Sequence, residues 1–255
     1  TTNTTGAQNV AIGRDALLGN TTGADNTAVG VGSLGANTTA SNNTAVGRLA
    51  LAANTTGTDN TAVGRSSGAA ITTGLYNTLI GGLAGDALTD ADENVAVGQS
   101  ALTTDTKGNR NVAVGQIALA TQNFTTSTDS YNTGVGYAAG SAVTTGIQNT
   151  LIGALAGDAL SDADYNVAVG SQALSSDTLG SRSVAVGQSA LFTQNFTTAT
   201  NAYNTAVGMS AGAAVTTATN NTFIGGLSGD AATTGASNTF VGQNSGGATT
   251  TGGQN

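Results

Sequence analysis

A pentapeptide of the form Asn-(Thr/Val)-x-(Val/Ile)-Gly recurs along the whole chain, and this repeat limits the possible folds more than any other feature. Successive copies start at a constant spacing of seventeen positions, which lengthens to twenty-one from 111 to 132 and from 183 to 204. A fixed period of this length indicates structural units that stack on one another. The copies begin at Asn9, Asn26, Asn43, Asn60, Asn77, Asn94, Asn111, Asn132, Asn149, Asn166, Ser183, Asn204, Asn221 and Asn238.

A longer period is superimposed on the short one. Residues 60–131 match residues 132–203, and each block holds three units of the ordinary length followed by one longer unit. Residues 204–255 begin a third block. Neither end carries an atypical repeat of the kind that caps a solenoid. We therefore expect residues 1–255 to be a single array and an excerpt of a longer repeat protein.

Each unit, numbered from its Asn as position 1, has a restricted residue at several positions. Position 4 is always Val or Ile, position 5 is always Gly, position 8 is Ala or Ser, and position 9 is Leu or Gly. Side chains alternate across a strand, so positions 2 and 4 share one face and position 3 lies on the other. Gly marks a bend or a close backbone approach, and the frequent Asn-Thr-Thr-Gly at positions 12 to 15 is typical of a turn. One unit is predicted to be strand, bend, short strand and turn.

The predicted fold class is all-β, because no window shows helical spacing of apolar residues. We expect a parallel β-solenoid, or β-roll, of about fourteen stacked coils. Stacking places each residue over its equivalent at about 4.8 Å. It predicts an Asn ladder at position 1, a buried Val/Ile ladder at position 4 and a Gly column at position 5. Representative ladder residues are Asn26, Val29, Gly30, Asn94, Val97, Gly98, Asn166, Val169 and Gly170.

The thinness of the coil bears on assembly. Because so short a unit encloses little volume, we expect apolar surface at positions 3, 8 or 9 to remain uncovered. Three chains associated around an axis would bury that surface, which favours a homotrimer.

Two segments resemble a known family. The stretches 183–190 (Ser-Val-Ala-Val-Gly-Gln-Ser-Ala) and 94–101 (Asn-Val-Ala-Val-Gly-Gln-Ser-Ala) resemble the S-V-A-I-G-x-x-A repeats of trimeric autotransporter adhesin heads. The longer pattern of residues 43–47 (Asn-Thr-Ala-Val-Gly) followed by residues 54–57 (Asn-Thr-Thr-Gly) also looks like repeats of phage tail-fibre proteins and bacterial surface proteins. The resemblance covers the whole chain. It implies a left-handed parallel β-roll that is trimeric, extracellular on a cell surface or virion, and involved in attachment.

The two longer units carry insertions at matching places. Insertions in solenoids emerge as loops, often on the binding face. Each insertion contains a Phe and ends at a Tyr, so these loops are candidates for binding a glycan or protein receptor. The alternative is that the Phe tucks over the coil edge and the loop is a spacer. The candidate residues are Asn123, Phe124, Thr125, Tyr131, Asn195, Phe196, Thr197 and Tyr203.

Composition argues against several other functions. The chain has no His and no Cys, so the usual zinc and copper ligands and the commonest general base are missing. A net charge of −8 would repel nucleic acid, and no apolar run is long enough to insert into a membrane. Oxygen ligands for Ca²⁺ could come from acidic turns, whose alternative interpretation is a solvated surface. These weak calcium candidates are Asp90, Asp92, Asp162 and Asp164. We predict no metal site and no cofactor.

Three function classes follow from the sequence. The first is a structural or adhesive extracellular fibre segment that self-associates and gives rigid reach. The second is an ice-binding or other repetitive surface-recognition module, although adjacent Thr residues of a strand point to opposite faces. The third is a polysaccharide-depolymerising spike, which needs paired carboxylates. No Asp/Glu pair lies outside the repeating context, so we predict that the chain is not an enzyme.

Overall fold

The structure, a computed structural model, describes residues 3–255, which form strands and turns and no helix. A three-residue strand covers positions 2 to 4 of each unit, and equivalent strands pair in parallel with the spacing of the repeat. The prediction of an all-β parallel solenoid of about fourteen turns is confirmed. The chain divides into two compact units, Thr1–Tyr131 and Asn132–Asn255, and the division falls where the second sequence block begins.

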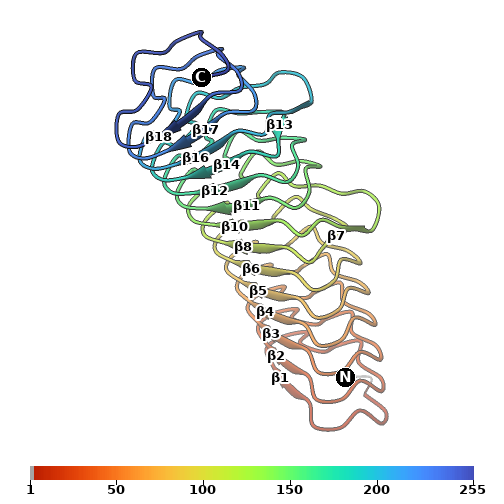
Figure 1. The fold of residues 1–255 in the computed structure, drawn as a ribbon. Helices are drawn as coiled ribbons and strands as arrows, with labels where there is room; N and C mark the ends of the chain where they lie inside the picture. The colour runs from red at the N-terminus through yellow and green to blue at the C-terminus, as the bar shows by residue number, and fades with distance from the viewer. Residues whose placement is uncertain (1–2) are drawn as a thin grey trace. The chain divides into compact units, whose positions relative to one another are not determined.

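The first unit stacks its strands in sequence order, as the arrows of Figure 1 show. The pairing is in register, so that Ala28 lies beside Ala45 and Val29 beside Val46. A second sheet pairs two short strands on another side of the coils. The main strands are β1 (Val10–Ile12), β2 (Thr27–Val29), β3 (Thr44–Val46), β4 (Thr61–Val63), β5 (Thr78–Ile80), β6 (Val95–Val97) and β8 (Val112–Val114), and the short ones are β7 (Gly108–Asn109) and β9 (Thr128–Asp129).

The second unit repeats this arrangement. Val167 lies beside Val184 and Ala168 beside Ala185, so the register is again that of the repeat. The main strands are β10 (Thr133–Val135), β11 (Thr150–Ile152), β12 (Val167–Val169), β14 (Val184–Val186), β16 (Thr205–Val207), β17 (Thr222–Ile224) and β18 (Thr239–Val241), and the short pair is β13 (Gly180–Ser181) with β15 (Thr200–Asn201).

The second strand expected between the bend and the turn of each coil is wrong, and the short strand pairs lie later in their coils. Positions 5, 7 and 9 all have positive φ, as in Gly30 (136°), Gly32 (69°) and Leu34 (47°). An extended strand needs negative φ at every residue, so this backbone can only turn. The turns are nevertheless tied to the neighbouring coil, for example by the Leu34 N–H, which donates to the Ala50 carbonyl at 3.0 Å.

The core lies on position 3 and not on position 4. Ala96 is fully buried, whereas Val97 is only half-buried. The same holds for Val29 and Val169, so the expectation of a buried Val/Ile ladder is wrong. Positions 3, 8 and 9 are buried in inner coils of the single chain, which also corrects the expectation that their apolar surface stays uncovered. At the strands, the inward position 3 is mostly Ala, while the β-branched side chains of positions 2 and 4 face outward.

Two kinds of coil fill this core. Where position 9 is Leu, position 12 is Asn, Asp or Gln and position 3 is Ala; where position 9 is Gly, position 12 is usually aliphatic. The structure explains the exchange: a Cβ on Gly85 would lie 2.8 Å from side-chain atoms of both Leu79 and Leu88. Since protein interiors are close-packed, only one of these sets of side chains can occupy a coil.

The polar interior is hydrogen-bonded from coil to coil. Asn94 is fully buried, and its Oδ1 accepts the Asn111 N–H at 2.9 Å while its Nδ2 donates to the Gly108 carbonyl. Asn26 and Asn166 make the equivalent bonds at their own positions. Buried amides with these partners avoid the cost of unpaired polar groups.

Candidate recognition surface

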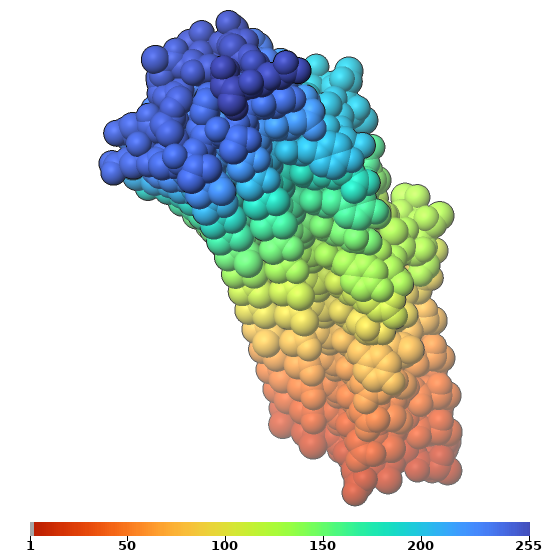
Figure 2. Space-filling view, in the orientation of Figure 1, coloured from red at the N-terminus to blue at the C-terminus, as the bar shows by residue number. Residues whose placement is uncertain are grey.

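The inserted loops are anchored at their bases. β9 pairs with β7 and β15 with β13, and the loops project beyond the ordinary coils in Figure 1. In Figure 2 the green atoms of the first loop stand out from the surface of their unit. Phe124 is 7% exposed and Phe196 is 6% exposed. These rings therefore pack inward and present no face to a ligand, whereas Thr125 and Thr197 at the loop tips are exposed.

A buried carboxylate fixes each loop in place. Asp105 is fully buried and accepts the Gly108 N–H at 3.0 Å, the Phe124 N–H at 3.0 Å and the Gln122 side-chain amide at 2.5 Å. Asp177 has the same set of partners in the second unit. These carboxylates are buried among structural partners and have no access to a substrate, and neither was singled out from the sequence.

Four of the five tyrosines occupy the last position of their coils, two in each unit. All four are exposed, and their φ angles are 58° at Tyr76, 51° at Tyr131, 59° at Tyr165 and 50° at Tyr203. Sequence reasoning found Tyr131 and Tyr203 as loop ends but missed Tyr76 and Tyr165, although the repeat register places them at the same position of their coils.

The two loop asparagines lie nearer the loop bases. The Asn123 Oδ1 accepts the Thr106 hydroxyl at 3.2 Å, and the Asn195 Oδ1 accepts the Thr178 hydroxyl at 3.0 Å. Both bonds reach the preceding coil, so these asparagines contribute to the attachment of the loops.

In the first unit the last-position column is neutralised by ion pairs. Arg110 contacts Glu93, with Nε 3.1 Å from Oε2, and also pairs with Asp129. Its guanidinium lies 5.8 Å from the centre of the Tyr131 ring. The hydrogen bond to Glu93, then the bond to Tyr131 and the charge of Asp129, raise the pKa of Arg110 above its ordinary value. The guanidinium is permanently charged and is engaged with partners of its own unit.

In the second unit the equivalent cation is Arg182, which forms no ion pair with the described residues. Arg182 lies 4.5 Å from the centre of the Tyr165 ring, and its Nε donates to the Asn201 Oδ1 at 3.0 Å. No carboxylate among residues 3–255 lies within ion-pair distance of it. Arg182 and Tyr203 are both exposed, so this column offers a cation beside the Tyr165 ring, with Tyr203 at the same position of the next coil.

The acidic calcium candidates serve contacts between coils. Asp92 and Asp164 each accept a backbone N–H of the preceding coil at 2.8 Å. Asp90 lies 3.6 Å from Lys107, and Asp162 accepts the Thr145 hydroxyl. Across the described residues, no three acidic side chains come together in a way that could hold a metal ion.

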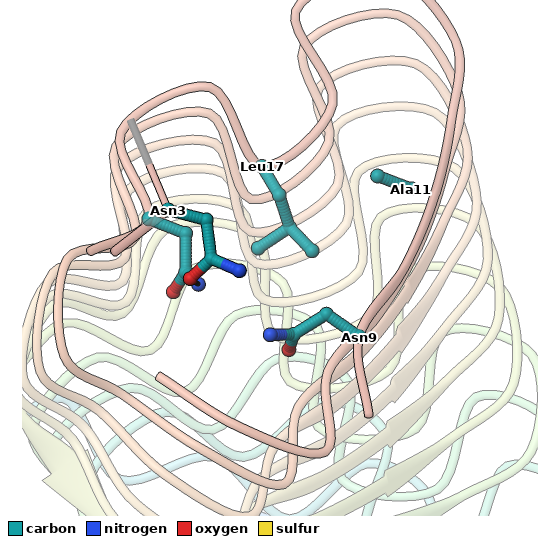
Figure 3. Close-up of a pocket in the computed structure, with 5 residues that line it drawn as sticks. Asn3, Asn9, Ala11 and Leu17 are labelled. Atoms are coloured by element: carbon teal, nitrogen blue, oxygen red, sulfur yellow. Dashed lines mark hydrogen bonds between the residues drawn. The ribbon is translucent and has the colours of Figure 1, made fainter. Parts of the chain in front are cut away.

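A hollow of about 180 Å³ lies at the first coil of the first unit. Figure 3 shows Asn3, Asn9, Ala11 and Leu17 around it. These are interior positions, which in later coils are covered by a neighbouring coil on either side. The hollow is therefore the core seen end-on and has none of the features of a site built for a ligand.

Comparison with known proteins adds no match to this description. No family model matches the chain, and neither a curated protein nor a solved structure matches it. Among residues 3–255 there is also no helix with the length and apolar character needed to cross a membrane.

Proposed function

We propose that this chain is a segment of an extracellular structural and adhesive fibre, and that it works as a homotrimer. The observation that supports the proposal is the outward face of the main sheet in each unit. Position 2 is only Thr or Val and position 4 only Val or Ile, and no residue of either column is buried. A solvent-facing strip with no charged side chain along its length is typical of an interaction surface.

A second copy of the chain is the occupant that fits this strip best. Its side chains repeat with every coil, at the strand spacing of about 4.8 Å. A partner that contacts it continuously must repeat at the same interval, and an identical chain does so. Closed symmetry would bury the strip in every copy, and three chains around an axis leave the loops outside.

Sedimentation equilibrium of the purified protein tests the proposal directly. We expect a mass three times that of the 24.5 kDa chain. Because the strip carries no charge, the assembly should persist in 1 M salt, where the screening length is about 3 Å. A single-chain mass at micromolar concentration would contradict the proposal.

Ice binding remains a second candidate, because the same strip carries a regular array of hydroxyl and methyl groups. Thr27, Thr44 and Thr61 follow one another on adjacent strands, and each is two residues from a Val. This Thr-x-Val spacing puts both side chains on one face, unlike the adjacent Thr pairs of the turns. Thermal hysteresis in a protein that sediments as a monomer would favour this function over the fibre.

A further inference from the structure

The two sequence blocks differ around the last-position column in a way that changes its chemistry. Residues 60–131 and 132–203 align with a constant offset, so Arg110 corresponds to Arg182 and Tyr131 to Tyr203. The two carboxylates that neutralise Arg110 belong to Glu93 and Asp129, whose counterparts are the uncharged Tyr165 and Asn201. The second block therefore has the cation without the two anions.

We propose that Tyr165, Arg182 and Tyr203 bind a carboxylate-bearing sugar of an extended acidic polysaccharide. Arg182 is held through Nε by Asn201 and lies over the Tyr165 ring. Its Nη1 and Nη2 groups have no hydrogen-bond partner within residues 3–255, and the side chain is exposed, so both groups can donate to a ligand. A guanidinium presented in this way matches the two oxygens of a carboxylate.

The two tyrosines occupy a position where the backbone favours other residue types. The last position of a coil has the left-handed backbone conformation, which Asn and Asp tolerate better than larger residues. The early coils use Asp25, Asn42 and Asp59 there. Tyr165 and Tyr203 adopt the same φ, and 38% and 53% of their surfaces remain exposed, so part of each ring is open to a ligand. A rigid, amphipathic ring at such a place is suited to contact with a ligand such as the face of a sugar.

The shape of the site favours a polymer over a small acid. Tyr165, Arg182 and Tyr203 lie on successive coils, so the site extends along the stack in steps of about 4.8 Å. It is an open surface. The net charge of −8 opposes polyanions in general, so the affinity must come from this one guanidinium, which can receive one carboxylate of a polysaccharide. This inference rests on the proposed adhesive role and names its ligand class.

Binding of oligogalacturonate, measured by calorimetry on the full chain, tests the site. Its methyl ester is the matched probe, because it keeps the sugar and masks the carboxylate. We expect the acid to bind at least about tenfold more tightly than the ester, from the strength of charged hydrogen bonds. Equal affinity for both probes, or no binding of either, would overturn the proposal, and so would equal affinity for an acidic peptide such as oligoglutamate.

The first block supplies the control variants. The double variant Tyr165→Glu with Asn201→Asp gives Arg182 the same two carboxylates that neutralise Arg110. It should therefore abolish binding of the sugar, while the chain folds and sediments as before. The reciprocal pair, Glu93→Tyr with Asp129→Asn, should raise the number of sites per chain from one to two. Unchanged binding in the first double variant would refute the site.

Sedimentation separates this inference from the fibre role on which it rests. The sedimented mass reports the assembly without reference to the sugar. If the oligomer is intact but the sugar does not bind, the sugar site is refuted and the fibre role is unaffected. If the chain is a monomer that binds the sugar, the fibre role is refuted and the sugar site is supported.

Discussion

The short distance between neighbouring coils determines which residue type is allowed at some positions of the repeat. Within each unit, position-5 glycines lie against the carbonyl of the next such Gly. Gly98 has a φ of 142°, and a Cβ on it would lie 2.4 Å from the Gly115 oxygen. The invariance of this Gly was readable from the sequence as a close backbone approach. The burial of Ala96 instead of Val97 was not, because strand alternation defines two faces without saying which one is inside.

Substituting this glycine should therefore be costly. Gly98→Ala combines a disfavoured φ with a backbone clash, so we expect a loss of about 2–4 kcal/mol in the free energy of unfolding. Gly82→Ala is the matched control, since a Cβ there would have no neighbour within 4 Å and its φ is not in the left-handed region. Urea denaturation of both variants checks the difference. Similar midpoints for the two would show that the coils can separate to admit a methyl group.

At the scale of one coil, several positions act together. The exchange between Leu and Gly at position 9 follows the volume at positions 3 and 12, and it could have been found by comparing the copies with one another. The anchoring of the loops could not. Asp105 and Asp177 look like ordinary turn residues in the sequence, and only the folded coil shows that they are buried beside Phe124 and Phe196.

Positions 9 and 3 of one coil should consequently be coupled energetically. Gly85→Leu alone places a large side chain against Leu79 and should cost about 1–3 kcal/mol through overpacking. Leu79→Ala alone should cost about 2–5 kcal/mol by leaving a cavity. Together the two substitutions give positions 3 and 9 the residues found in the coil that begins at Asn94, where Ala96 accompanies Leu102. In a double-mutant cycle measured in urea, the double variant should lose less unfolding free energy than the two single variants added together, by at least about 0.5 kcal/mol. Strict additivity would mean that the two side chains do not share space.

For the molecule as a whole, the repeat predicted the fold class, the number of turns and the register, because each copy repeats the same constraints. It could not predict the proposed binding surface. That surface depends on where copies differ, as Arg182 differs from Arg110 only through its neighbours Tyr165 and Asn201. Such differences acquire meaning once the last-position column is known to face solvent.

The two sides of one strand should respond differently to the same substitution. Val97→Asp places a carboxylate on the outward strip, where it stays hydrated, so the unfolding free energy should change by less than about 1 kcal/mol. The like charges would meet in an assembled trimer, so the sedimented mass should fall to that of one chain. Ala96→Asp, one residue earlier, buries the charge in a core position with no exposed surface and should cost several kcal/mol. Circular dichroism together with sedimentation separates the two effects. If Val97→Asp stays folded and keeps the wild-type mass, the strip is not the contact between copies.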